Sequence, residues 1–211
     1  MAHSRSVNPD PGYTMTLTGQ GLITAPPDLA VIRLGVQTTG TNVSQIQSEN
    51  AQIIQNIVQA LSQFESAEMK TIEYSIDRLY EYQNGNPIDK GYQVKHILEI
   101  KTGNIDEAGK IIDTAVEMGA NIVDSIFFVL ADSELFYQQA LNLAVDNAIQ
   151  KSRSVSANIH IKLNPVPIRI IENSISPAAI PLLPRQIVST PVISGELTIQ
   201  AFITADFVYS E

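Results

Sequence analysis

Several stretches of the chain alternate apolar and polar residues, which is the pattern of strands with one buried face. The predicted strands are 13–18, 30–36, 72–82, 92–100, 166–171 and 196–208. The first two are separated only by Gly19-Gln20-Gly21 and the turn 25–28, so we expect them to form a hairpin. A further strand, 122–130, is apolar on both faces, which predicts a central position in a sheet.

Helical periodicity marks three further segments. Asn42 stands at the start of the first, with Gln45 three residues later, an arrangement typical of an N-cap, and the apolar stripe runs to Phe64. The second helix is predicted over 105–118 and ends at Gly119, a suitable C-cap. The third begins at Asp132 or Ser133 and runs to about Asn158. Its small residues predict close packing against a sheet.

The expected order is therefore ββαββαβαββ, which favours a single α+β domain over 13–211 with antiparallel sheets packed by three helices. Residues 1–12 are predicted to be a flexible tail. Residues 174–194 form one long irregular stretch that is rich in proline and apolar side chains. Loops of this length usually have a task, so this loop is expected either to fold back over its own core or to be a contact surface for another subunit.

Charge and composition exclude several classes of function. Thirteen Lys and Arg against 22 Asp and Glu give a net charge of −9, which disfavours nucleic-acid binding. The chain has no Cys and three His, and it has neither a His-Glu-x-x-His motif nor a calcium loop, so we expect no metal and no cofactor. No apolar run approaches the roughly 20 residues of a membrane helix.

The first residues contain no hydrophobic segment of the kind that a secretory signal requires. The sequence as written therefore predicts a cytoplasmic protein. The alternative is an exported or cell-envelope protein whose signal has been removed.

Five motifs in the same order resemble the SIMPL-domain family, from about Tyr13 to Phe207. They are Thr18-Gly-Gln-Gly-Leu-Ile-Thr-Ala-Pro-Pro-Asp-Leu-Ala30, Tyr80-Glu-Tyr82 with Gly91-Tyr92, Gly119-Ala-Asn121 with Ile126-Phe127 and Leu130-Ala-Asp132, Tyr137-Gln-Gln-Ala140 with Ala144, Asp146 and Ala148, and Gly195-Glu-Leu-Thr-Ile199. The resemblance implies an α+β domain that is typically exported in bacteria. In some members it implies ring-like or channel-like oligomers, stress protection or association with signalling kinases. It implies no catalytic residues. Ser152, Ser154 and Ser156 replace the alanines that the family favours at the end of the third helix.

The residues offer little catalytic chemistry. Gly19-Gln20-Gly21 lacks the third glycine of a dinucleotide loop, so a bend or a close approach by a neighbouring chain is favoured there. His96 lies in an apolar alternation, which favours a hydrogen-bonded core or interface histidine, and His160 is expected on the surface. Asp28 and Asp132 have positions typical of turns and caps.

We therefore expect a non-enzymatic protein that forms a ring- or channel-like homo-oligomer. The predicted binding residues, for a subunit or a ligand, are Tyr80, Tyr82 and Tyr92 around one hairpin, and Leu182, Leu183 and Ile187 in the long loop. Membrane contact by the loop is less favoured. The alternatives are a monomeric module that binds a small ligand or peptide, and a hydrolase that would require a site at His96.

Overall fold

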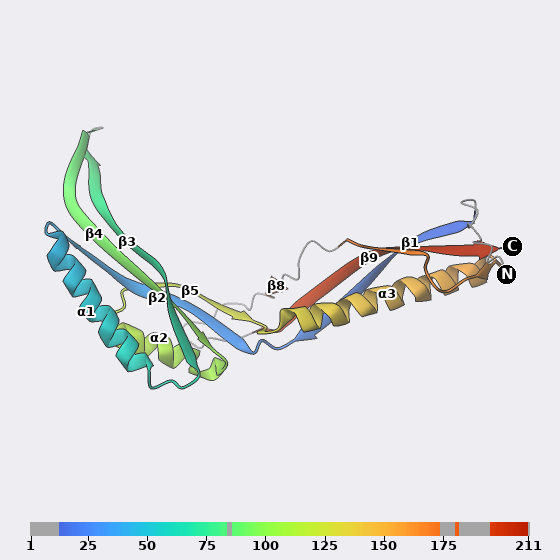
Figure 1. The fold of residues 1–211 in the computed structure, drawn as a ribbon, viewed down its shortest axis with the longest axis horizontal. Helices are drawn as coiled ribbons and strands as arrows, with labels where there is room; N and C mark the ends of the chain where they lie inside the picture. The colour runs from blue at the N-terminus through green and yellow to red at the C-terminus, as the bar shows by residue number, and fades with distance from the viewer. Residues whose placement is uncertain (1–12, 84–85, 174–179, 182–194, 211) are drawn as a thin grey trace, which may run out of the picture. The chain divides into compact units, whose positions relative to one another are not determined.

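The structure, a computed structural model, describes residues 13–83, 86–173, 180–181 and 195–210 (Figure 1). It contains two compact units. Among the described residues, unit 1 draws on 13–25, 132–173, 180–181 and 196–210, and unit 2 on 26–83, 86–131 and 195. The predicted α+β class is confirmed: two antiparallel sheets pack with three helices in the expected order.

Unit 2 is a four-stranded sheet in the order β3-β4-β2-β5. The strands are β2 (Leu29–Gly40), β3 (Ala67–Gln83), β4 (Asn86–Thr102) and β5 (Ile122–Val129). Helix α1 (Val43–Leu61) packs on β2 and β4, and α2 (Ala108–Glu117), which follows the short helix η1 (Ile105–Glu107), packs on β2. The apolar faces of α1, α2, β2 and β4 meet between the helices and the sheet, and the core there contains Ala30, Ile32, Leu34, Ile54, Ile57, Leu98, Ile100 and Ile111.

Capping residues fix the helix ends as predicted. The Asn42 side chain accepts from the backbone N–H of Gln45 (3.2 Å), and the Asp132 side chain accepts from that of Leu135 (3.1 Å). Gly119 has φ +107 directly after α2, and the N–H groups of Gly119 and Ala120 donate to the carbonyls of Val116 and Ala115. This pair of bonds is the Schellman arrangement, which needs a residue that tolerates positive φ.

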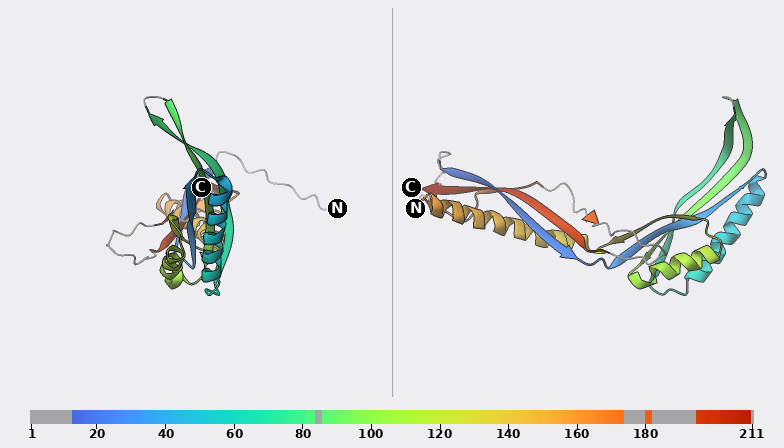
Figure 2. Two further views of the ribbon diagram at one scale, coloured as in Figure 1. Left: turned by 90° about the vertical axis from the view of Figure 1, so that its left-hand side faces the viewer. Right: turned by 180° about the vertical axis from the view of Figure 1, so that it is seen from behind.

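Unit 1 brings the two ends of the described chain together. Strand β1 (Thr14–Ala25) pairs along its length with β9 (Leu197–Ser210), from Thr14 opposite Val208 to Ala25 opposite Leu197. Three short strands also pair with β9: β6 (Lys162–Leu163), β7 (Arg169–Glu172) and β8 (Ile180–Pro181). Helix α3 (Ser133–Asn158) lies along β1 and β9 (Figure 2).

The prediction that the first two strands form a hairpin is wrong, because β1 pairs with β9 whereas β2 pairs with β4 and β5. A tight hairpin needs turn residues at positive φ, and the turn here contains Pro26 and Pro27, whose rings fix φ at negative values. The turn therefore leads the chain out of one sheet and into the other.

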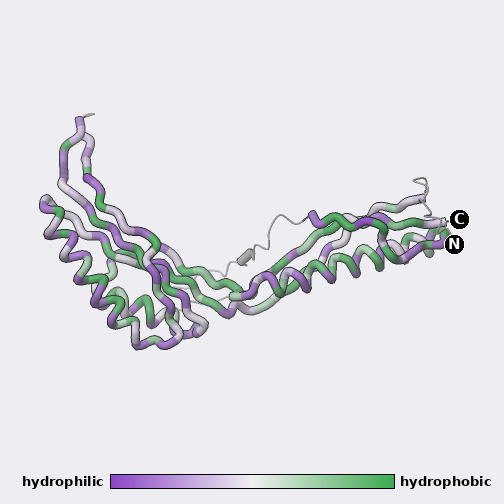
Figure 3. Tube along the Cα trace, in the orientation of Figure 1, coloured by the Kyte–Doolittle hydropathy of each residue, from purple (hydrophilic) through white to green (hydrophobic). Residues whose placement is uncertain are grey.

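The central position predicted for 122–130 is also wrong. In the described part of the chain β5 pairs only with β2, which makes it an edge strand. Its apolar sequence (Figure 3) is only partly covered: Ile126 and Phe128 pack against the core, while Val123 and Phe127 are exposed.

The backbone of α3 lies directly on β1. Residues four positions apart form one buried small-residue face of the helix: Ala140, Ala144, Ala148, Ser152 and Ser156. A Cβ on Gly19 would overlap the carbonyl oxygen of Ala144, and a Cβ on Gly21 would overlap that of Ala140. The close approach expected at these glycines is therefore made by the chain's own helix. The serines at 152 and 156 continue the same face, with their hydroxyls bonded to carbonyls of α3.

This close packing lets α3 cover the outer edge of β1. Tyr209 N–H donates to Tyr13 O, so odd-numbered residues of β1 bond to β9 and even-numbered ones face the other edge. There the side chain of Asn147 accepts from Gln20 N–H (3.2 Å), and Lys151 Nζ donates to Thr18 O (2.9 Å). Side chains of the helix thus occupy backbone groups that another strand would otherwise bind.

We predict that Gly21→Ala lowers the free energy of unfolding by about 3 kcal/mol, because the new Cβ overlaps helix backbone that cannot move aside locally. Gly109→Ala is the matched control, since its Cβ meets nothing within 4 Å in α2, and it should raise stability by about 0.5 kcal/mol. Urea denaturation of both variants measures the difference. Equal stabilities would contradict the contact between α3 and β1.

Candidate functional site

A two-stranded arm extends from the sheet of unit 2. Strand β4 pairs with β2 only from Tyr92 to Thr102, whereas its pairing with β3 continues to Gln83 opposite Asn86. Among the described residues, 79–83 and 86–91 therefore have only each other as strand partners, and we call them the arm (Figure 1). The arm contains two of the predicted binding residues, Tyr80 and Tyr82, and Tyr92 lies at its base.

A glycine at the base allows the arm to leave the sheet. Gly91 has φ +94, and a Cβ there would lie 2.5 Å from the carbonyl oxygen of Gly40. The Asp89 side chain accepts from Gly91 N–H (2.8 Å), and the ladder shifts register between Leu79 and Tyr80. A side chain at position 91 would force the end of β2 and the arm apart.

Arg78 holds two of the predicted tyrosines. Its Nε and Nη2 donate to the hydroxyl of Tyr92 (3.2 and 3.1 Å), and its Nη1 lies 3.4 Å from that of Tyr80. The guanidinium also lies 5.3 Å from the centroid of the Tyr92 ring. The bonds to Tyr80 and Tyr92 raise the already high pKa of Arg78, so it stays cationic. The structure thus brings Tyr80 and Tyr92 together around a cation, and Tyr82 further along the arm is 71% exposed.

Exposed apolar side chains continue from the arm down β3. They are Ile72, Tyr74, Ile76 and, in the arm, Ile88. Tyr74 meets the His96 ring edge-to-face at 5.3 Å, and His96 Nε2 hydrogen bonds Thr71 Oγ1 (2.9 Å). Burial lowers the pKa of His96, so its ring is neutral at pH 7. The prediction of a hydrogen-bonded histidine at position 96 is confirmed, and His160 is exposed just after α3 as expected.

The other half of the predicted site lies outside the described residues. Leu182, Leu183 and Ile187 belong to the stretch 182–194, so their predicted contact role stays a prediction.

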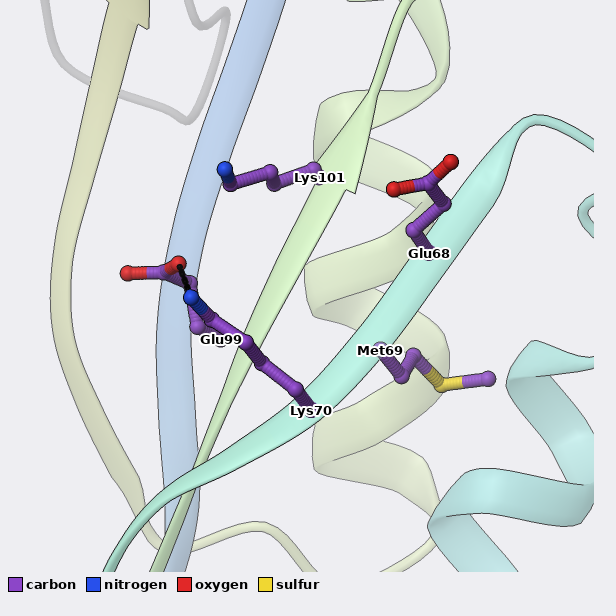
Figure 4. A pocket seen from close by; sticks show the side chains of 5 residues that line it. All are labelled: Glu68, Met69, Lys70, Glu99 and Lys101. Atoms are coloured by element: carbon purple, nitrogen blue, oxygen red, sulfur yellow. Dashed lines mark ion pairs between the residues drawn. The ribbon is translucent and has the colours of Figure 1, made fainter.

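A row of side chains crosses the sheet face opposite the helices, and sequence reasoning missed it. Glu99 on β4, only 8% exposed, accepts from Arg33 on β2 (3.1 Å) and pairs with Lys70 on β3 (3.0 Å). Arg33 in turn lies 5.6 Å from the ring centroid of Phe127 on β5. Figure 4 shows Lys70 and Glu99 meeting across the strands, beside a hollow of about 120 Å³. The sequence does show that Lys70, Glu99 and Arg33 each lie on the polar face of a strand. That they meet follows only from the register, in which Glu99 is opposite both Arg33 and Lys70.

Lysine and arginine set the charge of this buried carboxylate. The hydrogen bond from Lys70 is the largest influence that lowers the pKa of Glu99, burial opposes it, and Arg33 adds to the lowering. The Glu99 carboxylate therefore stays ionised in the folded protein at a pH somewhat below 4.5, which is the ordinary pKa of a glutamate side chain.

Other chemistry in the described part of the chain is limited. No group of three or more His, Cys, Asp or Glu side chains is placed to hold a metal ion there. The carboxylate of Asp132 accepts from the backbone N–H of Leu135, which confirms its cap role. The carboxylate of Asp28 accepts from the N–H of Ala131, which follows β5, so it links two segments far apart in the sequence. No helix among these residues is long and apolar enough to cross a membrane.

The comparison with protein families decides what kind of domain this is. The family described as SIMPL, protein of unknown function (DUF541), matches residues 15–207, which spans both units. The chain belongs to the SIMPL family. A search of curated proteins gives no match.

Most motifs that carry the SIMPL resemblance have a structural role. Gly19 and Gly21 admit α3, and Asp132 caps it. Asn121 continues the pairing of β5, because its side-chain amide accepts from Gln37 N–H and donates to Gln37 O (2.8 Å each). Tyr80-Glu-Tyr82 differs, since both aromatic side chains remain exposed. The arm is therefore the candidate interaction site of this SIMPL protein.

We predict that Glu99→Gln lowers the free energy of unfolding at pH 7 by about 2 kcal/mol, because Arg33 and Lys70 lose their shared anion. A carboxylate with a lowered pKa stabilises the fold above its unfolded pKa, and this contribution is lost as the pH falls through the folded value. The difference from wild type should therefore vanish as the pH is taken well below 4.5. Denaturation from pH 7 to pH 3 measures it.

Glu68→Gln is the matched control, since Glu68 borders the same hollow but forms no ion pair with the described residues. It should leave stability unchanged at every pH. A Glu99→Gln effect that does not shrink as the pH falls from 7 to 3 would contradict the electrostatic explanation.

Proposed function

We propose that this SIMPL protein is a non-enzymatic assembly protein that forms a homo-oligomer, with the arm as a contact surface. The observation that carries the proposal is the exposure of Tyr82 and Tyr80 on an arm that projects beyond β2. Tyrosine is enriched in protein interfaces because its ring buries apolar area while its hydroxyl remains hydrogen-bonded.

The order of the arm supports an interface role. Arg78 bonds to the hydroxyls of both Tyr80 and Tyr92, and the ion pair between Lys90 and Glu81 (2.7 Å) joins the two strands of the arm. Side chains that are already held in place lose less entropy on binding. The rings of Tyr80 and Tyr92 can therefore contact a partner without a further loss of side-chain freedom.

Two further observations favour assembly over the other functions considered. The hollow at Glu99, about 120 Å³, is smaller than the roughly 300 Å³ at which ligand pockets begin, and mostly charged side chains line it. A wider hollow of about 410 Å³ beside Gln63 and Glu107 is lined mainly by polar side chains, whereas ligand pockets are mostly apolar. His96, on which a hydrolase would depend, hydrogen bonds the Thr71 hydroxyl rather than a carboxylate. Both observations support a role in assembly.

The wider role that we propose follows from the family resemblance. A ring- or channel-like assembly of this kind would act in stress protection or in the cell envelope, provided that the protein is exported. Its partner would be further copies of the same chain.

We predict that the wild-type protein has a solution mass that is a multiple of 23.0 kDa, and that Tyr80→Ser combined with Tyr82→Ser reduces it. Removing the two exposed rings from an interface weakens association, while the fold is retained because neither ring belongs to its core. Light scattering after size-exclusion chromatography measures the mass, and circular dichroism checks the fold.

Leu22→Ser is the control, because Leu22 is as exposed as Tyr80 but lies on β1 of unit 1. Its mass should equal that of the wild type. A wild-type mass of 23.0 kDa at all concentrations would contradict the proposal of assembly, and an assembly indifferent to the tyrosines would contradict the role of the arm.

A further inference from the structure

Strand β5 has the sequence of a central strand and the position of an edge strand. Seven of its eight positions hold Ile, Val, Phe or Ser, and Asp124 is its one charged residue. Val123 and Phe127 are 48% and 47% exposed. A strand that is apolar on both faces is normally flanked on both sides. In the described part of the chain only β2 flanks it.

The other edges of the two sheets carry features that oppose pairing. Asn147 and Lys151 occupy backbone groups of β1. Strand β3 has two register shifts and six charged residues among its seventeen positions. Strand β7 has four residues, begins with Arg169, ends with Glu172 and follows Pro167. Short strands, bulges, charges and prolines are the usual protection of sheet edges.

Strand β5 carries less protection. Its bulge sets Asp124 apart and leaves Ser125–Val129 in regular register with Leu29–Arg33. The outer backbone groups of this stretch have no strand partner among the described residues. An apolar strand with an open edge favours pairing with another strand.

We propose that β5 pairs antiparallel with β5 of a second copy across a two-fold axis, which joins two four-stranded sheets into one. This inference rests on the proposed function and names one of its contacts. A strand that meets its own copy gives a closed, isologous contact that does not propagate. The pairing makes β5 the central strand that its sequence describes.

Charge complementarity selects a second copy as the occupant. The guanidinium of Arg33 lies over Phe127, and two of its nitrogens, Nε and Nη2, bond to Glu99, while Nη1 has no hydrogen-bond partner in the described part of the chain. Antiparallel pairing places the end that carries Asp124 beside the Phe127 end of the other copy. The single anion of each β5 thus approaches the Arg33 of its neighbour, and the symmetry makes this contact twice.

The test compares the wild type with Val123→Lys and Phe127→Lys by light scattering over a range of concentrations. Both positions are half exposed, so the monomer tolerates the change. In the antiparallel contact a lysine at position 127 lies close to its own copy across the two-fold axis, and a lysine at position 123 lies at the end that faces Arg33 of the other copy, so each change brings like charges together. We expect association through this edge to weaken by about 100-fold or more and the mass to fall to half or less. Leu143→Lys on α3, 43% exposed, is the control and should match the wild type.

Two variants keep the test decisive, because Phe127→Lys also removes the Arg33 contact whereas Val123→Lys does not. A wild-type assembly that neither lysine disturbs, in variants with native circular dichroism, would overturn the β5 contact. If the tyrosine variant of the arm still dissociates in that case, the proposed function stands. A wild type that is monomeric throughout overturns both.

Discussion

The close contact between the backbones of α3 and β1 determines how the outer edge of β1 is covered. It exists because two positions on the strand have no side chain, Gly19 and Gly21, and because the facing helix positions hold alanine and serine. Backbones packed this closely leave no room for water between them, which fixes the helix along the strand. The same proximity carries Asn147 and Lys151 to the outer edge of β1, which closes that edge to other strands.

In unit 2 the edge strands of the sheet are only partly covered. Its helices cover β2 and β4, where the most buried apolar side chains lie, and leave the flanking strands β3 and β5 partly uncovered. On the opposite face, the row formed by Lys70, Glu99, Arg33 and Phe127 ties all four strands together. These contacts hold the centre of the sheet together, and the arm and β5 at its edges are the surfaces that we propose for contact with partners.

Local signals made the elements predictable. Apolar periodicity placed the strands and helices, and Asn42, Gly119 and Asp132 marked helix ends because caps are chosen by neighbouring backbone groups. Strand partners were not predictable in the same way. The pairing of β1 with β9 joins segments from the two ends of the described chain, and the sequence of neither strand indicates which strand is its partner.

The candidate site divides in the same manner. Three tyrosines near one turn could be found from spacing, but Arg78 could not, since its bonds to Tyr80 and Tyr92 depend on the register of β3 with β4. The Glu99 row was hidden because its members come from separate strands. The contact roles of Leu182, Leu183 and Ile187, the domain boundaries and the cytoplasmic location stay predictions.

Hydrogen exchange of the wild-type chain at low and high concentration tests the central claim, that β5 is the sheet edge left open for a second copy. The outward-facing amides of 122–129, which do not bond to β2, should become more protected as concentration rises, while the amides of β1 and β9 stay equally protected throughout. Rapid exchange in 122–129 at every concentration would show that the edge of β5 remains unpaired, and would contradict the account.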